Sequence, residues 1–314
     1  MNSKLTQKVE HVEIDEEIAH QRIDNFLIAR LKGVPKSRIY RMMRKGEVRI
    51  NRGRVKPSQK LEAGDVVRIP PVRISKMPVK VHPGNKITEL LESRILYEDE
   101  ALLVLNKPSG MAVHGGTGLA YSVIDGLRLI RPETRFLELV HRLDRETSGC
   151  LIVAKKRSAL RFLHACFREG RVTKKYLVLL AGIWQRKKML VDQPLLKNVQ
   201  KSGERMVVIS SAGKRAQTEF RRVRKFSGAT LVEAKLITGR THQIRVHSAY
   251  LGHPVAGDER YGESEKLKEM RKMGLSRLFL HAEELVLNHP ETGETLHINA
   301  PLDEALTSFL TAME

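Results

Sequence analysis

The stretch His141-Arg-Leu-Asp-Arg-Glu-Thr-Ser-Gly149 is followed directly by the apolar run Cys150-Leu-Ile-Val-Ala154. The apolar run predicts a buried strand. The small residues at positions 147–149 predict a turn that directs the preceding side chains from the sheet into a cleft. Asp144 lies between two arginines, and an acid so close to cations is kept in its ionised form.

An ionised carboxylate suits nucleophilic or electrostatic work better than proton donation at neutral pH. The flanking arginines, Arg142 and Arg145, suit a polyanionic substrate. Most neighbouring arginine and aspartate residues are nevertheless surface ion pairs with no further role. The interpretation of Asp144 therefore depends on the rest of the chain.

The composition of the chain predicts an anionic partner. Of its 314 residues, 41% are hydrophobic, which is enough for one large or two smaller domains. The formal net charge is +20, and residues 21–60 alone hold 13 basic and 2 acidic side chains. Such uneven positive charge favours nucleic acid as the partner. Two cysteines imply no disulfide framework, and no apolar run approaches the roughly 18 residues of a membrane span, so we expect a cytoplasmic protein.

The N-terminal part predicts a small basic module. After a tail at residues 1–19, helical spacing of apolar residues predicts a helix over 21–31, and a second helix capped by Ser37 and ended by Gly46. Strands are expected at 47–51 and 66–69, with a turn at 52–53. The second helix carries a basic stripe, which suits RNA phosphates unless it is only a solvated face: Arg38, Arg41, Arg44 and Lys45.

We expect an RNA-binding domain over residues 20–83, a linker region over 70–93 and a catalytic domain over 94–314. In the last of these, strands outnumber helices and do not alternate with them. The fold class is therefore α+β, with a mixed, largely antiparallel sheet rather than a doubly wound one. The strand candidates are 95–97, 102–105, 151–154, 176–180, 217–223 and 229–237, and the helix candidates are 158–169 and 241–251.

Cofactor motifs do not occur in the sequence. There is no phosphate-binding G-x-x-x-x-G-K-[ST], no dinucleotide G-x-G-x-x-G after a strand and no G-x-S-x-G elbow. The Gly-rich run at 115–118 lacks the lysine and helix of a phosphate loop. His242 and His247 are five residues apart, not four, and no C-x-x-C is present, so we expect neither a metal nor another cofactor.

Three further polar segments accompany Asp144, and together they resemble one family. The chain is similar to the pseudouridine synthases that modify ribosomal large-subunit RNA, and the basic module resembles the RNA-binding domain shared with ribosomal protein S-four. Several matched strings in the right order carry the resemblance: 141–149 (H-R-L-D-x-x-T-S-G), 103–110, 174–176 (K-x-Y), 238–247 (T-G-R-T-H-Q-I-R-V-H), 252–262 and 277–282.

The resemblance implies isomerisation of uridine to pseudouridine without a cofactor. Asp144 would be the essential carboxylate, acting either by covalent attack or by assisting elimination at the sugar. Arg245 would pair with Asp144, Tyr176 would stack on the target base and help remove the C5 proton, and Leu280 would form an apolar wall. A base inside folded RNA must be flipped out, and Arg142 would fill the gap because guanidinium stacks on bases.

Two other functions remain as alternatives. A non-catalytic rRNA-binding or ribosome-assembly factor would need the basic module but neither Asp144, Tyr176 nor Arg245. A hydrolase with an aspartate nucleophile would need a second acid or a metal beside Asp144. We expect a monomer with no obligate protein partner, acting on large-subunit rRNA or on its assembly intermediate.

Overall fold

The computed structural model describes residues 8–16, 18–31, 33–72, 85–115, 121–199, 205–262 and 265–314. The chain divides into two compact units, Met1–His82 and Pro83–Glu314. Each has its own apolar core. Most of the Gly-rich run and the middle of the expected linker lie outside the described residues.

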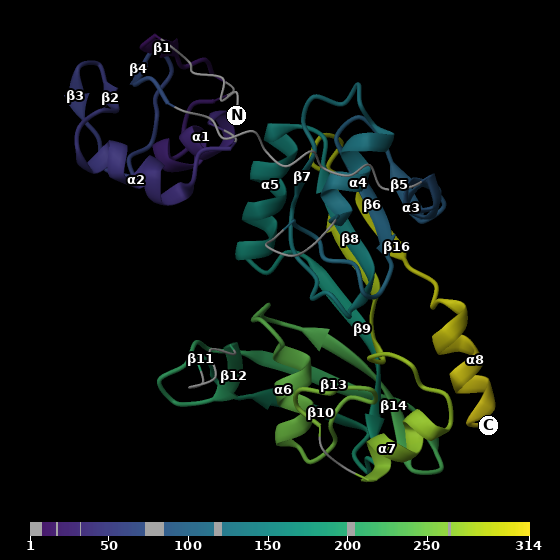
Figure 1. Cartoon of the computed structure of the whole chain (residues 1–314). Coiled ribbons are helices and arrows are strands. Elements are labelled where there is room, and N and C mark those ends of the chain that lie inside the picture. Colours follow the sequence, from purple (N-terminus) through teal and green to yellow (C-terminus); the bar gives the residue numbers. More distant parts are fainter. Residues whose placement is uncertain are drawn as a thin grey trace, which may run out of the picture. The chain divides into compact units, whose positions relative to one another are not determined.

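The first unit combines a small antiparallel sheet with two helices (Figure 1). The strands are in the order β1-β4-β2-β3. Leu27, Met42 and Val67 are fully buried between helices and sheet, so the helix periodicity seen in the sequence does mark the core face. The elements are β1 (Glu10–Glu13), α1 (Ile23–Arg30), α2 (Lys36–Arg44), β2 (Arg49–Ile50), β3 (Gly53–Arg54) and β4 (Val66–Ile69).

Three local predictions for this unit were wrong. β1 lies within the expected tail, where all four of its residues pair with β4. Ser37 does not cap α2, because the helix begins one residue earlier and the carbonyl of Pro35 accepts the N–H groups of Arg38 and Ile39. The β2–β3 turn is formed by residues 51–52, both with positive φ, as two-residue hairpins require.

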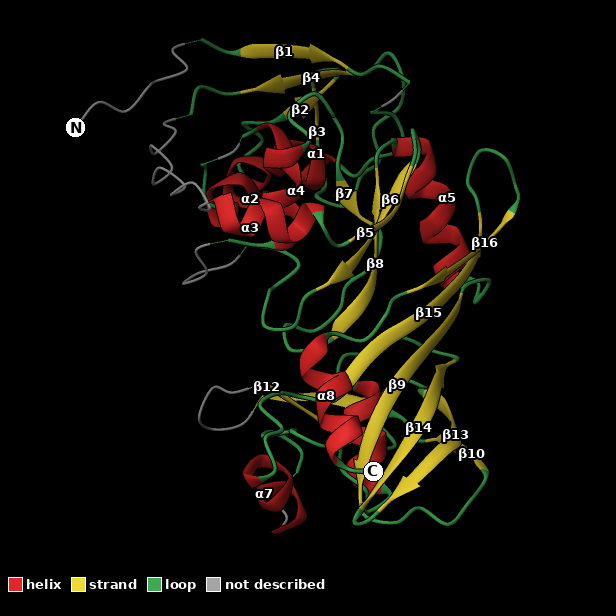
Figure 2. Ribbon diagram, turned by 90° about the vertical axis from the view of Figure 1, so that its right-hand side faces the viewer, coloured by secondary structure: helices red, strands yellow, loops and turns green. Residues whose placement is uncertain are grey.

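The second unit is built on one large mixed sheet in the order β10-β13-β14-β9-β15-β8-β6-β5, with β16 on β15 and β7 on β8. All of these pairs are antiparallel except β8 with β15, which confirms the α+β prediction. A separate hairpin pairs β11 with β12. Figure 2 shows β9 and β15 running side by side along this unit.

The bounds of the strands and helices of this unit are as follows: α3 (Asn85–Glu92), β5 (Ile95–Glu98), β6 (Leu102–Lys107), α4 (Val123–Ile130), β7 (Glu138–Leu139), β8 (Ser148–Ala154), α5 (Arg157–Arg168), β9 (Thr173–Ala181), β10 (Lys188–Asp192), β11 (Leu195–Val199), β12 (Arg205–Ile209), β13 (Gln217–Phe226), β14 (Ala229–Leu236), α6 (Gln243–Tyr250), α7 (Glu265–Lys272), β15 (Leu280–Asn288), β16 (Thr295–Asn299) and α8 (Glu304–Ala312).

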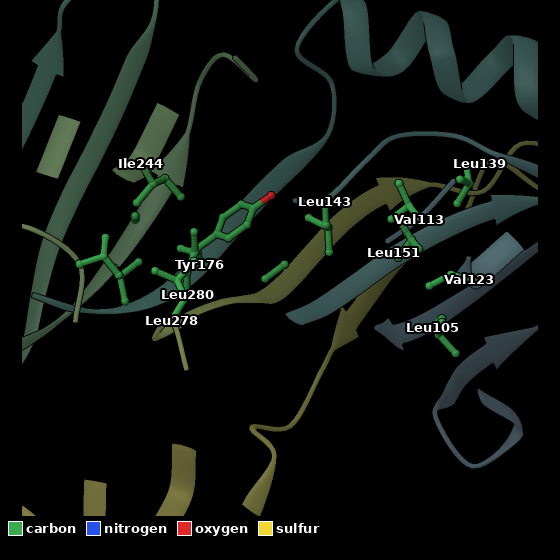
Figure 3. Packing of buried hydrophobic residues seen from close by; sticks show 14 of the residues in the cluster. Leu105, Val113, Val123, Leu139, Leu143, Leu151, Tyr176, Ile244, Leu278 and Leu280 are labelled. Atoms are coloured by element: carbon green, nitrogen blue, oxygen red, sulfur yellow. The ribbon is translucent and has the colours of Figure 1, made fainter. Parts of the chain in front are cut away.

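Side chains alternate between the two faces of the sheet, as the period of two requires. On β9, Tyr176 and Val178 pack in the cluster that also holds Leu143 and Leu280, whereas Leu177 and Leu179 pack on the opposite face. Figure 3 shows the first cluster around Tyr176. The tyrosine therefore belongs to the same sheet face as the segment that carries Asp144.

The centre of the sheet differs from the prediction because β15 was not recognised as a strand. Ala282 of β15 is in register with Tyr176 on one side and with Gly149 on the other. The φ of Gly149 is +106°, and a Cβ atom added to this residue would lie 2.2 Å from the carbonyl oxygen of Ala282. Only glycine permits this close approach, so Gly149 is a strand residue, not a turn residue as expected.

Two other boundaries also need correction. The turn next to Asp144 is formed by residues 145–146, closed by the N–H of Thr147 donating to the Asp144 carbonyl at 3.1 Å. The second unit begins before residue 94, because α3 belongs to it: Leu91 is fully buried and packs against Gly126 of α4. The sequence did not predict this helix, because α3 lies within the region 70–93 that was assigned to a linker.

Candidate active site

Four of the five residues predicted for the site line one cavity of about 330 Å³: Arg142, Asp144, Tyr176 and Leu280. The cavity lies where β8, β15 and β9 meet, since Asp144 precedes β8, Leu280 begins β15 and Tyr176 is on β9. Figure 3 shows Leu143 and Leu280 near the ring of Tyr176. A cavity of this size, which combines apolar with polar and charged side chains, suits a small molecule or a nucleobase.

The surroundings of Asp144 differ from the predicted arrangement. Arg142 is exposed, and Arg145 donates to the carbonyl of Gly110 at 2.9 Å instead of pairing with Asp144. Within the described part of the chain, the titratable side chain nearest to the carboxylate of Asp144 is the imidazole of His242, with Nε2 3.7 Å from Oδ2. The carboxylate is therefore half-buried beside an imidazole, and neither neighbouring arginine is its partner.

A buried lysine holds the turn that carries Asp144. The Nζ of Lys107, at the end of β6, donates to the carbonyls of Pro108, Met111 and Arg145 at 2.8, 2.8 and 2.9 Å. Its side chain is fully buried, and this burial lowers the pKa of Lys107 to about 7. The three bonds tie the loop after β6 to the residue next to Asp144. The sequence motifs did not predict this anchoring role of Lys107.

Tyr176 is held as a neutral phenol. Burial, and after it the negative charge of Asp144, raise the pKa of Tyr176 well above its usual value. Its ring lies in the apolar cluster with Leu143, Ile244 and Leu280 (Figure 3). A flat, protonated aromatic side chain in an apolar wall is suited to stacking on a base.

Arg245 does not pair with Asp144, which corrects the expectation. Its guanidinium donates two bonds to the carboxylate of Asp258, at 2.8 and 2.7 Å. The side chain of Arg245 is 10% exposed and that of Asp258 is 0% exposed. Burial opposes the charge on Arg245, but the bonds and charge of Asp258 outweigh it and raise the pKa of Arg245. A planar guanidinium binds most strongly to a carboxylate that accepts two parallel N–H donors, and Asp258 accepts from Nε and Nη2 of Arg245.

Sequence reasoning missed the residue that shapes the loop before α6. Gln243 is buried, and its side-chain amide makes four hydrogen bonds. Its Oε1 accepts from the hydroxyl of Thr238 and the N–H of Arg240, and its Nε2 donates to the carbonyl of Gln217 and the hydroxyl of Thr218. These bonds hold the loop against β13. A glutamine at a helix start carries no sequence signal that distinguishes this buried role from exposure to solvent.

An open cleft of about 1210 Å³ adjoins the cavity and shares Arg142, Asp144 and His242 with it. Arg245 lines this cleft and not the smaller cavity. The other cationic side chains of the cleft are Arg145, Arg260, Arg271 and Arg277. The arginines outnumber the acids of the lining, so the cleft suits a polyanion that presents one group to the inner cavity.

Among the described residues, no group of three His, Cys, Asp or Glu side chains is arranged to hold a metal ion. None of the helices in that part of the chain has the length and apolar character needed to cross a membrane.

Comparisons with known proteins agree with the geometry. Residues 101–250 match the family model of RNA pseudouridylate synthase, and residues 21–67 match the S4 domain. The chain is 56% identical over 312 residues to a "Ribosomal large subunit pseudouridine synthase C" of Pasteurella multocida, covering 98% of this chain and 95% of the relative. The protein of the same name from Escherichia coli K12 is 56% identical over 304 residues, covering 96% and 95%.

A solved structure also resembles this chain. "Human RNA Pseudouridylate Synthase Domain Containing 1" is 31% identical, with a TM-score of 0.59, and covers 74% of this chain and 90% of its own. The chain is thus similar in sequence to these relatives over nearly its whole length, including both units and the residues around the cavity. The chain belongs to the RNA pseudouridine synthase family, and it carries an S4 domain ahead of its synthase domain.

Proposed function

We propose that this protein isomerises specific uridines of large-subunit ribosomal RNA to pseudouridine, with Asp144 as the essential carboxylate. The reaction breaks the bond between C1′ and N1, turns the uracil and joins its C5 to C1′. The observation that carries the proposal is that Asp144 and Tyr176 line one cavity of about 330 Å³. The names of the relatives support the choice of large-subunit RNA.

The cavity supports base flipping as the route of entry. A uridine inside folded RNA must leave its stack before its glycosidic bond is accessible, at a cost of a few kcal/mol. Tyr176 and Leu280 then contact the flipped uracil, since both line the inner cavity. Because its raised pKa keeps the phenol of Tyr176 protonated, we assign Tyr176 to stacking on the base and not to removal of the C5 proton. Arg142 is exposed at the border between cavity and cleft, so its guanidinium can occupy the vacated position in the RNA.

Arg245 has a structural role in this proposal. It acts through its pair with Asp258 and contributes positive charge to the outer cleft beside Asp144. The exposed arginines of the cleft bind phosphates next to the target nucleotide: Arg145, Arg260 and Arg271. On the first unit, Arg41, Arg44 and Lys45 are exposed on α2 and bind more distant phosphates without reading bases. Arg38 contributes less, because it pairs with Glu47 at 3.3 Å.

The decisive experiment replaces Asp144 by asparagine, which keeps the shape of the side chain. We expect Asp144→Asn to bind large-subunit rRNA as the wild type does and to lose release of tritium from rRNA labelled at uridine C5. Glu291→Gln, which makes the same charge change in the turn between β15 and β16, should keep full turnover. Retained turnover in Asp144→Asn would contradict the assignment.

The same variant separates catalysis from a purely structural role on the ribosome. If the protein were a non-catalytic assembly factor, Asp144→Asn would restore every defect of a deletion strain, and the deletion itself would leave the pseudouridines of the rRNA unchanged. We further propose that it acts as a monomer in the cytoplasm. Both cysteines are free and buried, which fits a reducing compartment such as the cytoplasm. Pseudouridine mapping on naked rRNA and on assembling particles would identify the substrate form.

A further inference from the structure

A short chain of polar contacts leads from Asp144 to the segment after α6. The Nε2 atom of His242 lies 3.7 Å from Oδ2 of Asp144. On the other side of the same ring, Nδ1 lies 2.7 Å from the hydroxyl oxygen of Tyr261. That oxygen also accepts the backbone N–H of Val207 on β12, at 3.1 Å. His242 thus connects the carboxylate of Asp144 to the phenol of Tyr261, and the backbone of Val207 holds that phenol from another side.

These contacts favour one tautomer of the His242 ring. The oxygen of Tyr261 is already an acceptor for the N–H of Val207, so its own O–H is available to donate to Nδ1. Nδ1 is then an acceptor, and a neutral imidazole has its single proton on Nε2. Nε2 is the atom nearest to Asp144. The ring therefore presents an N–H donor to the carboxylate.

Burial favours the neutral ring of His242 against the mixed influence of the charged groups that face it. Burial is the largest influence and lowers the pKa of His242, and the positive charges of Arg245 and Arg260 lower it as well. The carboxylates of Asp144 and Asp258 oppose this effect without reversing it. Burial also raises the pKa of Tyr261, which keeps its hydroxyl protonated and able to donate.

The backbone at His242 is held in an uncommon conformation. Its φ is 54° and its ψ is 19°, which is the left-handed region, at the position just before α6. Residues other than glycine are strained in this region. The bonds of Gln243 hold the loop against β13, and the ring of Tyr261 meets that of His242 edge-on at 5.5 Å between centroids. The surrounding structure therefore enforces the ring position.

We propose that His242 is a positioning residue for Asp144: its neutral imidazole donates Nε2–H to the carboxylate, and Tyr261 holds the imidazole in that tautomer. This inference rests on the proposed role of Asp144. The contact closes from 3.7 Å to hydrogen-bond distance when substrate fills the cavity, as catalytic contacts do on binding. A donor on Oδ2 then leaves Oδ1 free to face the substrate.

The first test compares two substitutions of similar length. His242→Gln keeps an N–H donor at the ε position and His242→Met does not, while both meet the same backbone strain. We expect kcat of His242→Met to fall roughly 10- to 100-fold with KM unchanged, because misplacement of a reacting group has effects of this size. His242→Gln should recover most of the loss. Equal losses in both variants would overturn the proposal.

A double-mutant cycle tests whether Tyr261 acts through His242. Tyr261→Phe should lower kcat several-fold in the wild type and should have no effect on kcat in the His242→Met background, since residues that act as one unit are not additive. The same factor in both backgrounds would mean that Tyr261 only supports the fold, through Val207 and through the guanidinium of Arg245 that lies 5.0 Å above its ring.

A spectroscopic test does not depend on turnover or on any variant remaining active. In the full-length protein with ¹⁵N-labelled histidines, the signals of His242 are those absent from His242→Gln. We expect the shifts of a neutral ring protonated on Nε2 at pH 7, and Tyr261→Phe should shift the balance towards the other tautomer. A ring protonated on Nδ1, or on both nitrogens, would overturn the proposal. Failure of the Asp144→Asn test would instead contradict the proposed function and leave this tautomer result standing.

Discussion

The guanidinium of Arg245 and the cations of α2 show two ways in which this chain uses positive charge. Arg245 is 10% exposed and fixed by two bonds to a fully buried carboxylate. Arg41, Arg44 and Lys45 are exposed and, within the described residues, make no ion pair. Buried charge needs a dedicated partner, whereas exposed charge remains available to a ligand. The first region is therefore a fixed pair, and the second is an exposed basic surface, which we propose binds RNA.

The largest expected effect breaks the buried pair. Arg245→Met leaves the Asp258 carboxylate buried without its cation, and we expect the free energy of unfolding of the second unit to fall by about 3–5 kcal/mol. Adding Asp258→Asn should return part of the loss because no buried charge remains. In the first unit, Glu10→Gln removes the exposed pair with Arg30 and should cost less than about 1 kcal/mol. Denaturant unfolding measures the free energy of unfolding of all three variants. Equal losses for Arg245→Met and Glu10→Gln would refute the distinction between buried and exposed pairs.

A smaller effect compares one glycine from each unit. Gly149 and Gly64 both have positive φ, at +106° and +84°, but nothing lies within 4 Å of a Cβ added to Gly64. We expect Gly64→Ala to cost about 1–2 kcal/mol through backbone strain alone. Gly149→Ala adds the overlap with Ala282 and should cost about 3 kcal/mol or more. It should also slow turnover, because β8 must shift and Asp144 lies shortly before it. Similar unfolding midpoints for both variants would show that the contact between residue 149 and Ala282 tolerates a Cβ atom.

The smallest effect on stability belongs to the basic surface. Replacing Arg41 and Arg44 by glutamine should change the free energy of unfolding by no more than about 0.5 kcal/mol. RNA binding should weaken, and the slope of log K against log salt should decrease by about 0.7–0.9 for each phosphate that the variant no longer binds. Arg38→Gln, which breaks the pair with Glu47, should reduce the slope less. Titrations at several salt concentrations provide the measurement. A slope that stays at the wild-type value would show that α2 presents only a solvated face.

Local patterns predicted much of the fold. The structure confirms the helix that Gly170 follows, and apolar runs located β6, β8, β9, β13 and β14. Period and turn chemistry are properties of neighbouring residues, so they can be read from a short window. β15 was missed because its residues alternate weakly, although it occupies the centre of the sheet. The helix α3 was missed for a similar reason, since polar flanks surround its buried Leu91.

For the site, the sequence by itself determined the chemistry available: a carboxylate, a tyrosine, arginines and an apolar wall, of which Asp144, Arg142, Tyr176 and Leu280 share one cavity. Only the tertiary structure decided the partners. It paired Arg245 with Asp258, placed His242 beside Asp144 and anchored the Asp144 turn on Lys107. Partner choice depends on register between distant strands and loops, as where Gly149 meets Ala282, and such contacts leave no periodic mark in the sequence.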